Sequence, residues 1–236
     1  MDSDEIHFLD TNIILAMVLP KDFSYKECQN YLEHDCFRYL SNTACFEAEN
    51  KIMKIRRISL KISDYAKSYS MNNNVNPLRV DKHLSKVKKE FLMQYSDNNY
   101  PEELKKERFI SLVSDFFNEY HLELNNILLT QNTDELDELI ISSFRCSMYK
   151  FNNFLKEQLP ISFIKNTTKV KQFKEIGIHK TDAILLEESY FLHQFLNEEI
   201  FFITFDREIL ELKNYIKEIL SFKIFVVHPS YFTLIN

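Results

Sequence analysis

Apolar runs of about one strand's length alternate with helical patterns near both ends of the chain. Residues 6–9, 37–40, 200–203 and 224–227 fit strands, and residues 161–164 fit a short fifth strand at the edge of a sheet. The run 200–203 is apolar throughout and the run 6–9 is apolar except for His7, as in parallel strands covered on both faces. Helical patterns fill the intervals, beginning near residue 12, over 25–33 and from residue 43. The pattern predicts an α/β frame with a mostly parallel sheet.

The middle of the chain carries amphipathic stripes instead of strands. Apolar residues recur three and four positions apart over 81–95, 104–116 and 133–159, and the last stripe stops at Pro160, which cannot continue a helix. Such helices need a surface that covers their apolar faces. We therefore expect a helical subdomain over residues 58–160, inserted into one domain that spans residues 1–236. It can pack on the α/β frame or present a groove to another protein.

Four carboxylates stand where predicted strands meet helices. Asp10 follows the first strand, Asp206 follows the strand at 200–203, and Glu47 and Asp182 lie near the starts of helices. The carboxyl ends of parallel strands share one edge of a sheet, where α/β proteins bind ligands. Acids gathered there raise one another's pKa unless a cation neutralises them or they share protons. Ligand sets made only of oxygen atoms favour Mg²⁺ or Mn²⁺ over zinc, so the pattern predicts a magnesium-type site.

Each acid alone also has an ordinary structural explanation. Asp10 is placed to cap the next helix, Asp182 to complement a helix dipole, and Glu47 to lie on a solvated face. What favours a shared site is that small polar residues and an apolar run accompany every acid. These polar neighbours are Thr11, Asn12, Ser41, Thr43, Thr181 and Thr204.

Four short motifs occur in a recognisable order along the chain: Asp10-Thr11-Asn12, Ser41 through Glu47, Asp182-Ala183 opening an apolar helix, and Ile203-Thr204-Phe205-Asp206. Together with the tail at 224–232, they resemble the PIN domain, the nuclease fold of VapC-type toxins and of several RNA-processing enzymes. The resemblance covers roughly the first fifty and the last seventy residues, and it leaves the middle unmatched.

The resemblance implies a PIN-like α/β fold with a mostly parallel five-stranded sheet in the order 3-2-1-4-5, flanked by helices. Asp10 and Asp206 would then be neighbours. It also implies that the four acids, Asp10, Glu47, Asp182 and Asp206, hold one or two Mg²⁺ or Mn²⁺ ions, with Asn12 and Thr204 as supporting or substrate-positioning groups. The chemistry would be metal-assisted hydrolysis of RNA phosphodiester bonds by an endoribonuclease.

Two other functions stay open beside the endoribonuclease. An inactive PIN scaffold would bind RNA or protein through the insertion, although it would have no need of four clustered acids. A DNA-directed, structure-specific nuclease would use the same phosphodiester chemistry. By family analogy the substrate would be tRNA or single-stranded RNA. The insertion would select the substrate, bind a protein inhibitor such as an antitoxin, or form a homodimer. A phosphatase that uses an aspartyl nucleophile is disfavoured, because Asn12 stands where its second acid is required.

Charge and composition add little to the choice of function. The chain has 236 residues, a net charge of −6, a single glycine (Gly177) and four cysteines without a CxxC pair. It therefore lacks glycine-rich phosphate loops and zinc ribbons. Neither a targeting segment nor a membrane-spanning run is evident, which predicts a cytoplasmic protein without a membrane partner. Two basic runs flank the proposed ligands and are candidates for binding the RNA backbone. They supply Lys51, Lys54, Arg57, Lys169, Lys171 and Lys180.

Overall fold

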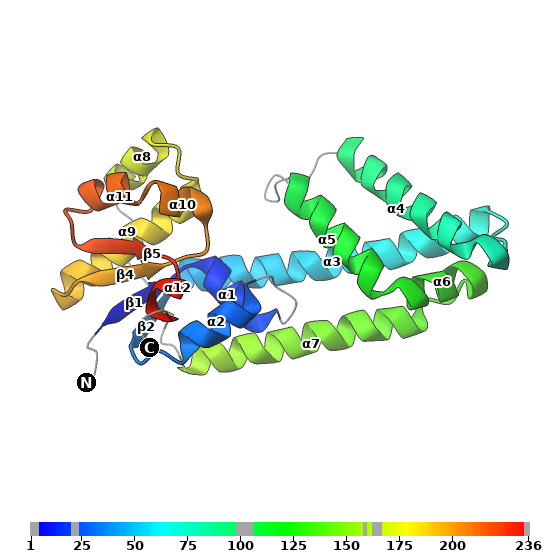
Figure 1. Ribbon diagram of the computed structural model, residues 1–236, viewed down its shortest axis with the longest axis horizontal. Coiled ribbons are helices and arrows are strands. Elements are labelled where there is room, and N and C mark those ends of the chain that lie inside the picture. The colour runs from blue at the N-terminus through cyan, green and yellow to red at the C-terminus, as the bar shows by residue number, and fades with distance from the viewer. Residues whose placement is uncertain (1–4, 20–23, 98–105, 158–159, 162–166, 234–236) are drawn as a thin grey trace. The chain divides into compact units, whose positions relative to one another are not determined.

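A computed structural model describes residues 5–19, 24–97, 106–157, 160–161 and 167–233. The chain divides into two compact units (Figure 1). The sheet unit comprises Met1–Ile52 and Ser147–Asn236, and the helical unit comprises Met53–Cys146. The helices α3 (Asn42–Asn72) and α7 (Asp134–Glu157) contribute residues to both units. The inserted unit thus spans residues 53–146, where the sequence predicted an insertion over 58–160.

Four parallel strands form the body of the sheet, in the order β2-β1-β4-β5. They are β1 (Ile6–Leu9), β2 (Phe37–Ser41), β4 (Ile200–Ile203) and β5 (Ile224–Val227). The central strand β1 is buried along its whole length, including His7, as its mostly apolar run predicts. Leu9 pairs with Ile203 in register, so the residues that follow these two strands emerge side by side.

The prediction of a five-stranded α/β sheet needs correction. The fifth strand, β3, has only two residues, Pro160–Ile161, which pair with Leu40 and Ser41 beside β2. With this short pairing included, the order is β3-β2-β1-β4-β5, but only four strands are of ordinary length and most of the described chain is helical. Proline has no N–H to donate, which limits pairing here. The rest of the predicted edge strand, residues 162–164, lies outside the described residues.

Seven helices of the sheet unit surround this sheet within the described chain. They are α1 (Thr11–Val18), α2 (Tyr25–Leu32), α8 (Thr167–Glu175), α9 (Lys180–Leu196), α10 (Arg207–Glu211), α11 (Lys213–Ile219) and α12 (Ser230–Thr233). The His7 ring contacts Tyr31 of α2 and Phe232 of α12, so these two helices cover one face of the sheet. Phe8 points to the opposite face, where its ring stacks on Phe202. Helix α9 packs beside β4 and β5.

The helical unit has a hydrophobic core of its own. Besides its parts of α3 and α7, it contains the 3₁₀ turn η1 (Pro77–Arg79), α4 (Val80–Asp97), α5 (Lys106–Glu119) and α6 (His121–Thr130). The stripes predicted over 81–95, 104–116 and 133–159 correspond to α4, α5 and α7, while residues 101–105 lie outside the described chain. The aromatic residues Phe91, Phe109, Phe116 and Phe117 line this core together with aliphatic residues of α3, α6 and α7. Helix α6 was not predicted from the sequence.

Candidate functional site

Asp10 and Asp206 lie at the adjacent ends of β1 and β4, and the Thr204 hydroxyl connects them. The Asp10 backbone N–H donates to the carbonyl oxygen of Ile203 at 3.0 Å, which continues the pairing of the two strands. Thr204 Oγ1 donates to Asp10 Oδ2 at 2.6 Å and accepts from the Asp206 N–H at 2.9 Å. The spatial adjacency of the two acids, which the sequence could only predict, is therefore present.

Asn12 joins the same network from the first turn of α1. Its Nδ2 donates to Asp10 Oδ2 at 2.7 Å and to Thr204 Oγ1 at 3.0 Å, and its Oδ1 accepts from the Phe205 N–H at 3.0 Å. Asp10 and Thr204 are almost completely buried. The two residues predicted to support the site, Asn12 and Thr204, thus orient the Asp10 carboxylate and tie the loop after β4 to α1.

Glu47 reaches the site from α3. Its Oε2 accepts from Thr11 Oγ1 at 2.7 Å, and its Oε1 pairs with Lys51 Nζ at 2.6 Å, one turn further along the helix. The start of α3 is held in place by Thr43, whose hydroxyl donates to Glu188 Oε1 on α9 at 2.8 Å. These contacts bring the helix of Glu47 to the edge of the sheet and against the helix that carries Asp182.

Asp182 lies in the first turn of α9, and its carboxylate accepts no hydrogen bond from another residue in the described part of the chain. Burial raises its pKa to about 6, with further contributions from the charges of Glu47 and Asp206, which the ammonium of Lys51 partly offsets. Asp182 is therefore electrostatically coupled to Glu47 and Asp206. Its oxygens remain uncommitted.

The pKa of the Asp10 carboxyl is also raised, in part by the negative charges of neighbouring acids. Burial and the charge of Asp182 raise its pKa to about 7, although the hydrogen bond from Thr204 opposes the rise. Glu47 adds to the repulsion. The pKa values of two of the four acids are therefore raised, first by burial and then by the charges of neighbouring carboxylates.

Two of the acids also cap helices, a role that the sequence suggested for Asp10 but not for Asp206. Asp10 caps α1 and accepts the Thr11 N–H at 2.6 Å, and Asp206 caps α10, where its Oδ1 accepts the Glu208 N–H at 2.8 Å. Capping leaves acceptor capacity on both carboxylates. Among described residues, no three of the four acids bring carboxylate oxygens within 4.8 Å of one another. The site is therefore an electrostatically coupled group of acids and not a closed cage.

No protein-family model matches this chain, and neither the curated proteins nor the solved structures contain a significant match.

The donor set fits a hard divalent cation. All four acids offer oxygen, the ligand type that Mg²⁺ and Mn²⁺ prefer. Burial is the largest cause of the raised pKa values of Asp10 and Asp182, and neighbouring carboxylates add to it with negative charge that a divalent cation would neutralise. Asp182 supplies uncommitted oxygens, while Asn12, Thr11 and Thr204 hold the other carboxylates in place. The residues present are thus suited to such an ion.

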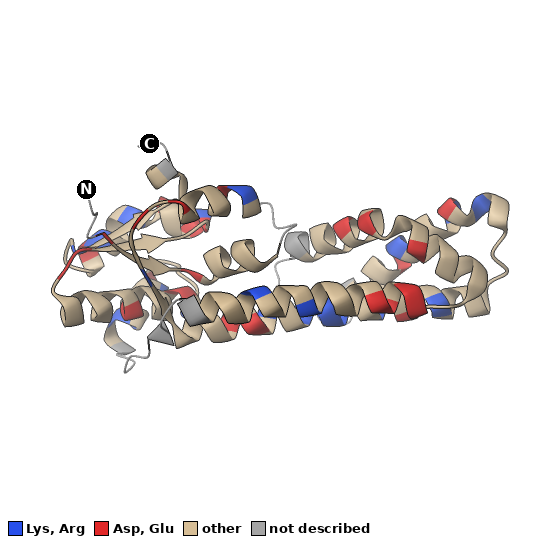
Figure 2. Cartoon of the chain, turned by 90° about the horizontal axis from the view of Figure 1, so that it is seen from below, with Lys and Arg blue, Asp and Glu red and all other residues tan. Residues whose placement is uncertain are grey.

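The six basic residues predicted to contact RNA have different surroundings. Lys51 pairs with Glu47, and Lys169 Nζ donates to the Ile219 carbonyl at 2.8 Å and lies 4.2 Å from the centre of the Tyr190 ring. Lys169 therefore joins α8 to α9 and α11. Lys171 and Lys180 are exposed on the sheet unit, whereas Lys54 and Arg57 belong to the helical unit. Basic and acidic residues are interspersed along the helices in the view of Figure 2.

Sequence reasoning undervalued two residues of the site. Thr11 is buried and bridges two of the acids, since its N–H donates to Asp10 and its hydroxyl donates to Glu47. Glu188 anchors Thr43, as described above. The signal for Thr11 was its position next to Asp10. No local signal marks Glu188, because its partner lies 145 positions away in the sequence.

In the part of the chain that the structure describes, no helix combines the length and the apolar character needed to cross a membrane.

The pH dependence of stability gives a first test of the coupled acids. The pKa of Asp182 is about 6 in the folded chain against an ordinary value of 3.8. Between these values the folded state holds more protons than the unfolded state, so ionisation of Asp182 destabilises the fold as the pH rises. We expect Asp182→Asn to gain stability relative to the parent between about pH 4 and pH 7, by on the order of 1–3 kcal/mol.

Urea denaturation of both proteins without metal, at a series of pH values, measures this difference. The quantity to compare is the difference in unfolding free energy between the variant and the parent. The pKa of His7 is lowered to about 3, so His7 makes both proteins more stable as the pH rises, and this effect cancels in the difference. The exposed acid Glu175 offers a control, and Glu175→Gln should follow the parent. A pH-independent difference between Asp182→Asn and the parent would show that the acids are not coupled as described.

Proposed function

We propose that this chain is a metal-dependent endoribonuclease of PIN type, in which Asp10, Glu47, Asp182 and Asp206 form the site. One observation carries the proposal: four acids from separate segments come together electrostatically at the carboxyl edge of a parallel sheet. Asp10 and Asp206 share Thr204, Thr11 links Asp10 to Glu47, and the charges of Glu47 and Asp206 act on Asp182. The PIN resemblance of the motifs around these same residues supports the choice of reaction.

The acids would hold one or two Mg²⁺ or Mn²⁺ ions. When bound, such an ion lowers the pKa of a coordinated water and stabilises negative charge at the reacting phosphate. No side chain has to form a covalent bond to the substrate.

The chain's own residues orient and balance this site. Thr204 and Asn12 donate to the same oxygen of Asp10 and so fix its direction. Lys51 holds Glu47 and offsets part of the negative charge. Asp182, whose oxygens accept no hydrogen bond from the described residues and whose pKa is raised to about 6, is the group placed to orient a water and accept its proton. Exposed Lys171 and Lys180 would contact the phosphate backbone.

The test is incubation of the purified chain with total RNA and with single-stranded DNA, in Mn²⁺ or Mg²⁺ and in excess EDTA. We expect internal cleavage of RNA that stops when EDTA removes the metal, because carboxylates alone neither generate hydroxide nor neutralise the phosphate. Cleavage of DNA but not RNA would favour the DNA-directed nuclease. RNA cleavage that persists in EDTA would contradict the metal site.

A second candidate function, RNA binding without cleavage, has one observation in its favour. A surface cavity of about 280 Å³ in the helical unit is lined by Tyr69, Arg79, Lys82, His83 and Lys86 with two asparagines, and no acid contributes to its wall. Such a cavity suits a phosphate group. The same incubations separate the two functions, since retention of RNA without any cleavage in Mn²⁺ or Mg²⁺ would support a binding scaffold.

A further inference from the structure

A second group of metal-ligand side chains lies in the sheet unit, away from the four acids. Glu5 precedes β1, His7 lies within β1, and His34 lies in the turn between α2 and β2. One ligand atom from each residue lies within 4.8 Å of the other two. The group is near the amino end of β1, whereas Asp10 follows its carboxyl end. Its residues therefore take no part in the proposed nuclease site.

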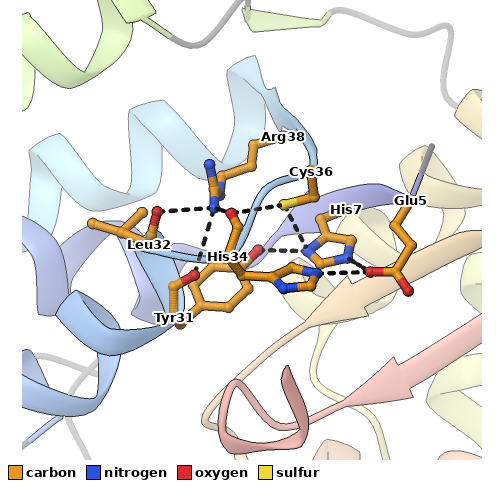
Figure 3. A network of polar contacts seen from close by, with 7 residues as sticks. All are labelled: Glu5, His7, Tyr31, Leu32, His34, Cys36 and Arg38. Carbon is orange, nitrogen blue, oxygen red and sulfur yellow. Dashed lines mark hydrogen bonds and ion pairs between the residues drawn. The ribbon is translucent and has the colours of Figure 1, made fainter. Parts of the chain in front are cut away.

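The three donor atoms point toward one another (Figure 3). Glu5 Oε2 lies 2.8 Å from His34 Nε2 and 3.4 Å from His7 Nε2. The two imidazole rings are nearly parallel, with an interplanar angle of 12°, so both Nε2 atoms face the same carboxylate. Two atoms bound to a tetrahedral zinc ion at about 2.1 Å lie about 3.4 Å apart. The pair His7 and Glu5 already has this spacing.

The Nε2 atom of His7 is a buried nitrogen that forms no hydrogen bond. Its ring is fully buried, with Nδ1 2.9 Å from the Tyr31 hydroxyl and 3.2 Å from Cys36 Sγ. An imidazole whose Nδ1 has partners and whose Nε2 has none can bind a metal through Nε2, and a partner at the other nitrogen is typical of metal ligands.

The surroundings hold the two imidazoles in position. Arg38 Nη2 donates to the backbone carbonyls of Leu32 and His34, which fixes the turn that carries His34. The Phe232 ring packs against both imidazoles, with centroids 4.4 Å from His7 and 4.9 Å from His34. Glu5 is about one-third exposed. The distance of 2.8 Å between Glu5 Oε2 and His34 Nε2 is shorter than two ligands of one ion require. Because the Glu5 carboxylate is partly exposed, it can move the few tenths of an ångström that are needed.

We propose that Glu5, His7 and His34 form a binding site for a zinc-type divalent ion. Two imidazole nitrogens and one carboxylate oxygen are ligands that suit zinc and not Mg²⁺, and they leave one position of a tetrahedral ion to water. The ion would join the start of β1 to the turn after α2.

The test is a calorimetric titration of the chelator-treated full chain with Zn²⁺, in excess Mg²⁺ so that the carboxylate site is filled. We expect one tight Zn²⁺ site per chain. Replacing even a partner of a ligand typically weakens metal binding 10- to 100-fold, so Glu5→Gln and His34→Ala should each weaken it by at least about 100-fold. His121→Ala is the matched control, because His121 Nε2 lies 3.1 Å from Asp81 but outside any such three-residue group among the described residues.

His34→Cys separates ligation from a structural role, because cysteine is a zinc ligand but cannot replace the ring packing of an imidazole. Retention of tight Zn²⁺ binding by His34→Cys, with loss in His34→Ala, is the expected pair of results. The proposal is overturned if the parent binds no Zn²⁺ tightly, if Glu5→Gln and His34→Ala bind it like the parent, or if Asp182→Asn removes the site. Circular dichroism of each variant checks that it is folded.

Discussion

Asp182→Asn is expected to lower Mn²⁺-dependent RNA cleavage by about 100- to 10,000-fold, the usual contribution of a positioned general base. Asp182 accepts no hydrogen bond from any residue that the structure describes, so its oxygens are available to orient a water. The substitution keeps the size of the side chain and removes its charge. The loss would appear as a lower rate of appearance of RNA fragments under single-turnover conditions.

The same substitution should leave the fold intact, which separates a catalytic loss from an unfolded protein. The charged form of Asp182 is disfavoured by burial and by neighbouring acids, so the variant should be at least as stable as the parent near neutral pH. Glu49→Gln is the matched control, since Glu49 is an exposed acid two positions from Glu47 on α3. Parental activity in Asp182→Asn, or an equal loss in Glu49→Gln, would refute the assignment.

Phe91→Ala is expected to lower the free energy of unfolding of the helical unit by about 3–5 kcal/mol, the usual cost of emptying a buried aromatic site. Phe91 is 1% exposed. Its ring meets the Tyr65 ring edge-on at 5.6 Å and the Tyr95 ring at 4.7 Å, and Tyr95 in turn meets Phe109. Alanine would remove the ring that joins these contacts and leave a cavity that a helical core cannot fully close.

Urea denaturation followed by circular dichroism measures this cost. Leu78→Ala is the control, because Leu78 is 93% exposed on η1 and its loss should change the stability by less than about 0.5 kcal/mol. A cost below about 1 kcal/mol for Phe91→Ala would mean that the helical unit does not depend on this packing.

The local patterns of the sequence were sufficient for most of the elements. The strands at 6–9, 200–203 and 224–227 lie where the apolar runs predicted them, and the stripes of the middle segment are helices. The reason is that an apolar run or a periodic apolar stripe indicates which face of a strand or helix must be buried. Helices α6, α8, α10, α11 and α12 went unpredicted. Helix α6 is apolar on more than one side, and α8 was taken only as a run of charge.

The acids of the candidate site could be named from the sequence because each follows or begins an element and has small polar neighbours. Their linkage could not be read from it. The contact between Thr204 and Asp10 joins positions 194 apart, and the one between Thr43 and Glu188 joins positions 145 apart. Such pairs are created by the packing of elements that are distant in the sequence. The family resemblance predicted that the four acids meet, but not the residues that link them.

By itself, therefore, the sequence determined the types of the main elements, the separate helical segment and the identity of the acids, because these depend on neighbouring residues. The tertiary structure alone decided the reduction of the fifth strand to two residues, the pKa values of Asp10 and Asp182, and the meeting of Glu5, His7 and His34. Each of these depends on residues that are distant in the sequence and on the burial that folding imposes. A lone histidine within an apolar strand gives no sign of the two partners that folding brings to it.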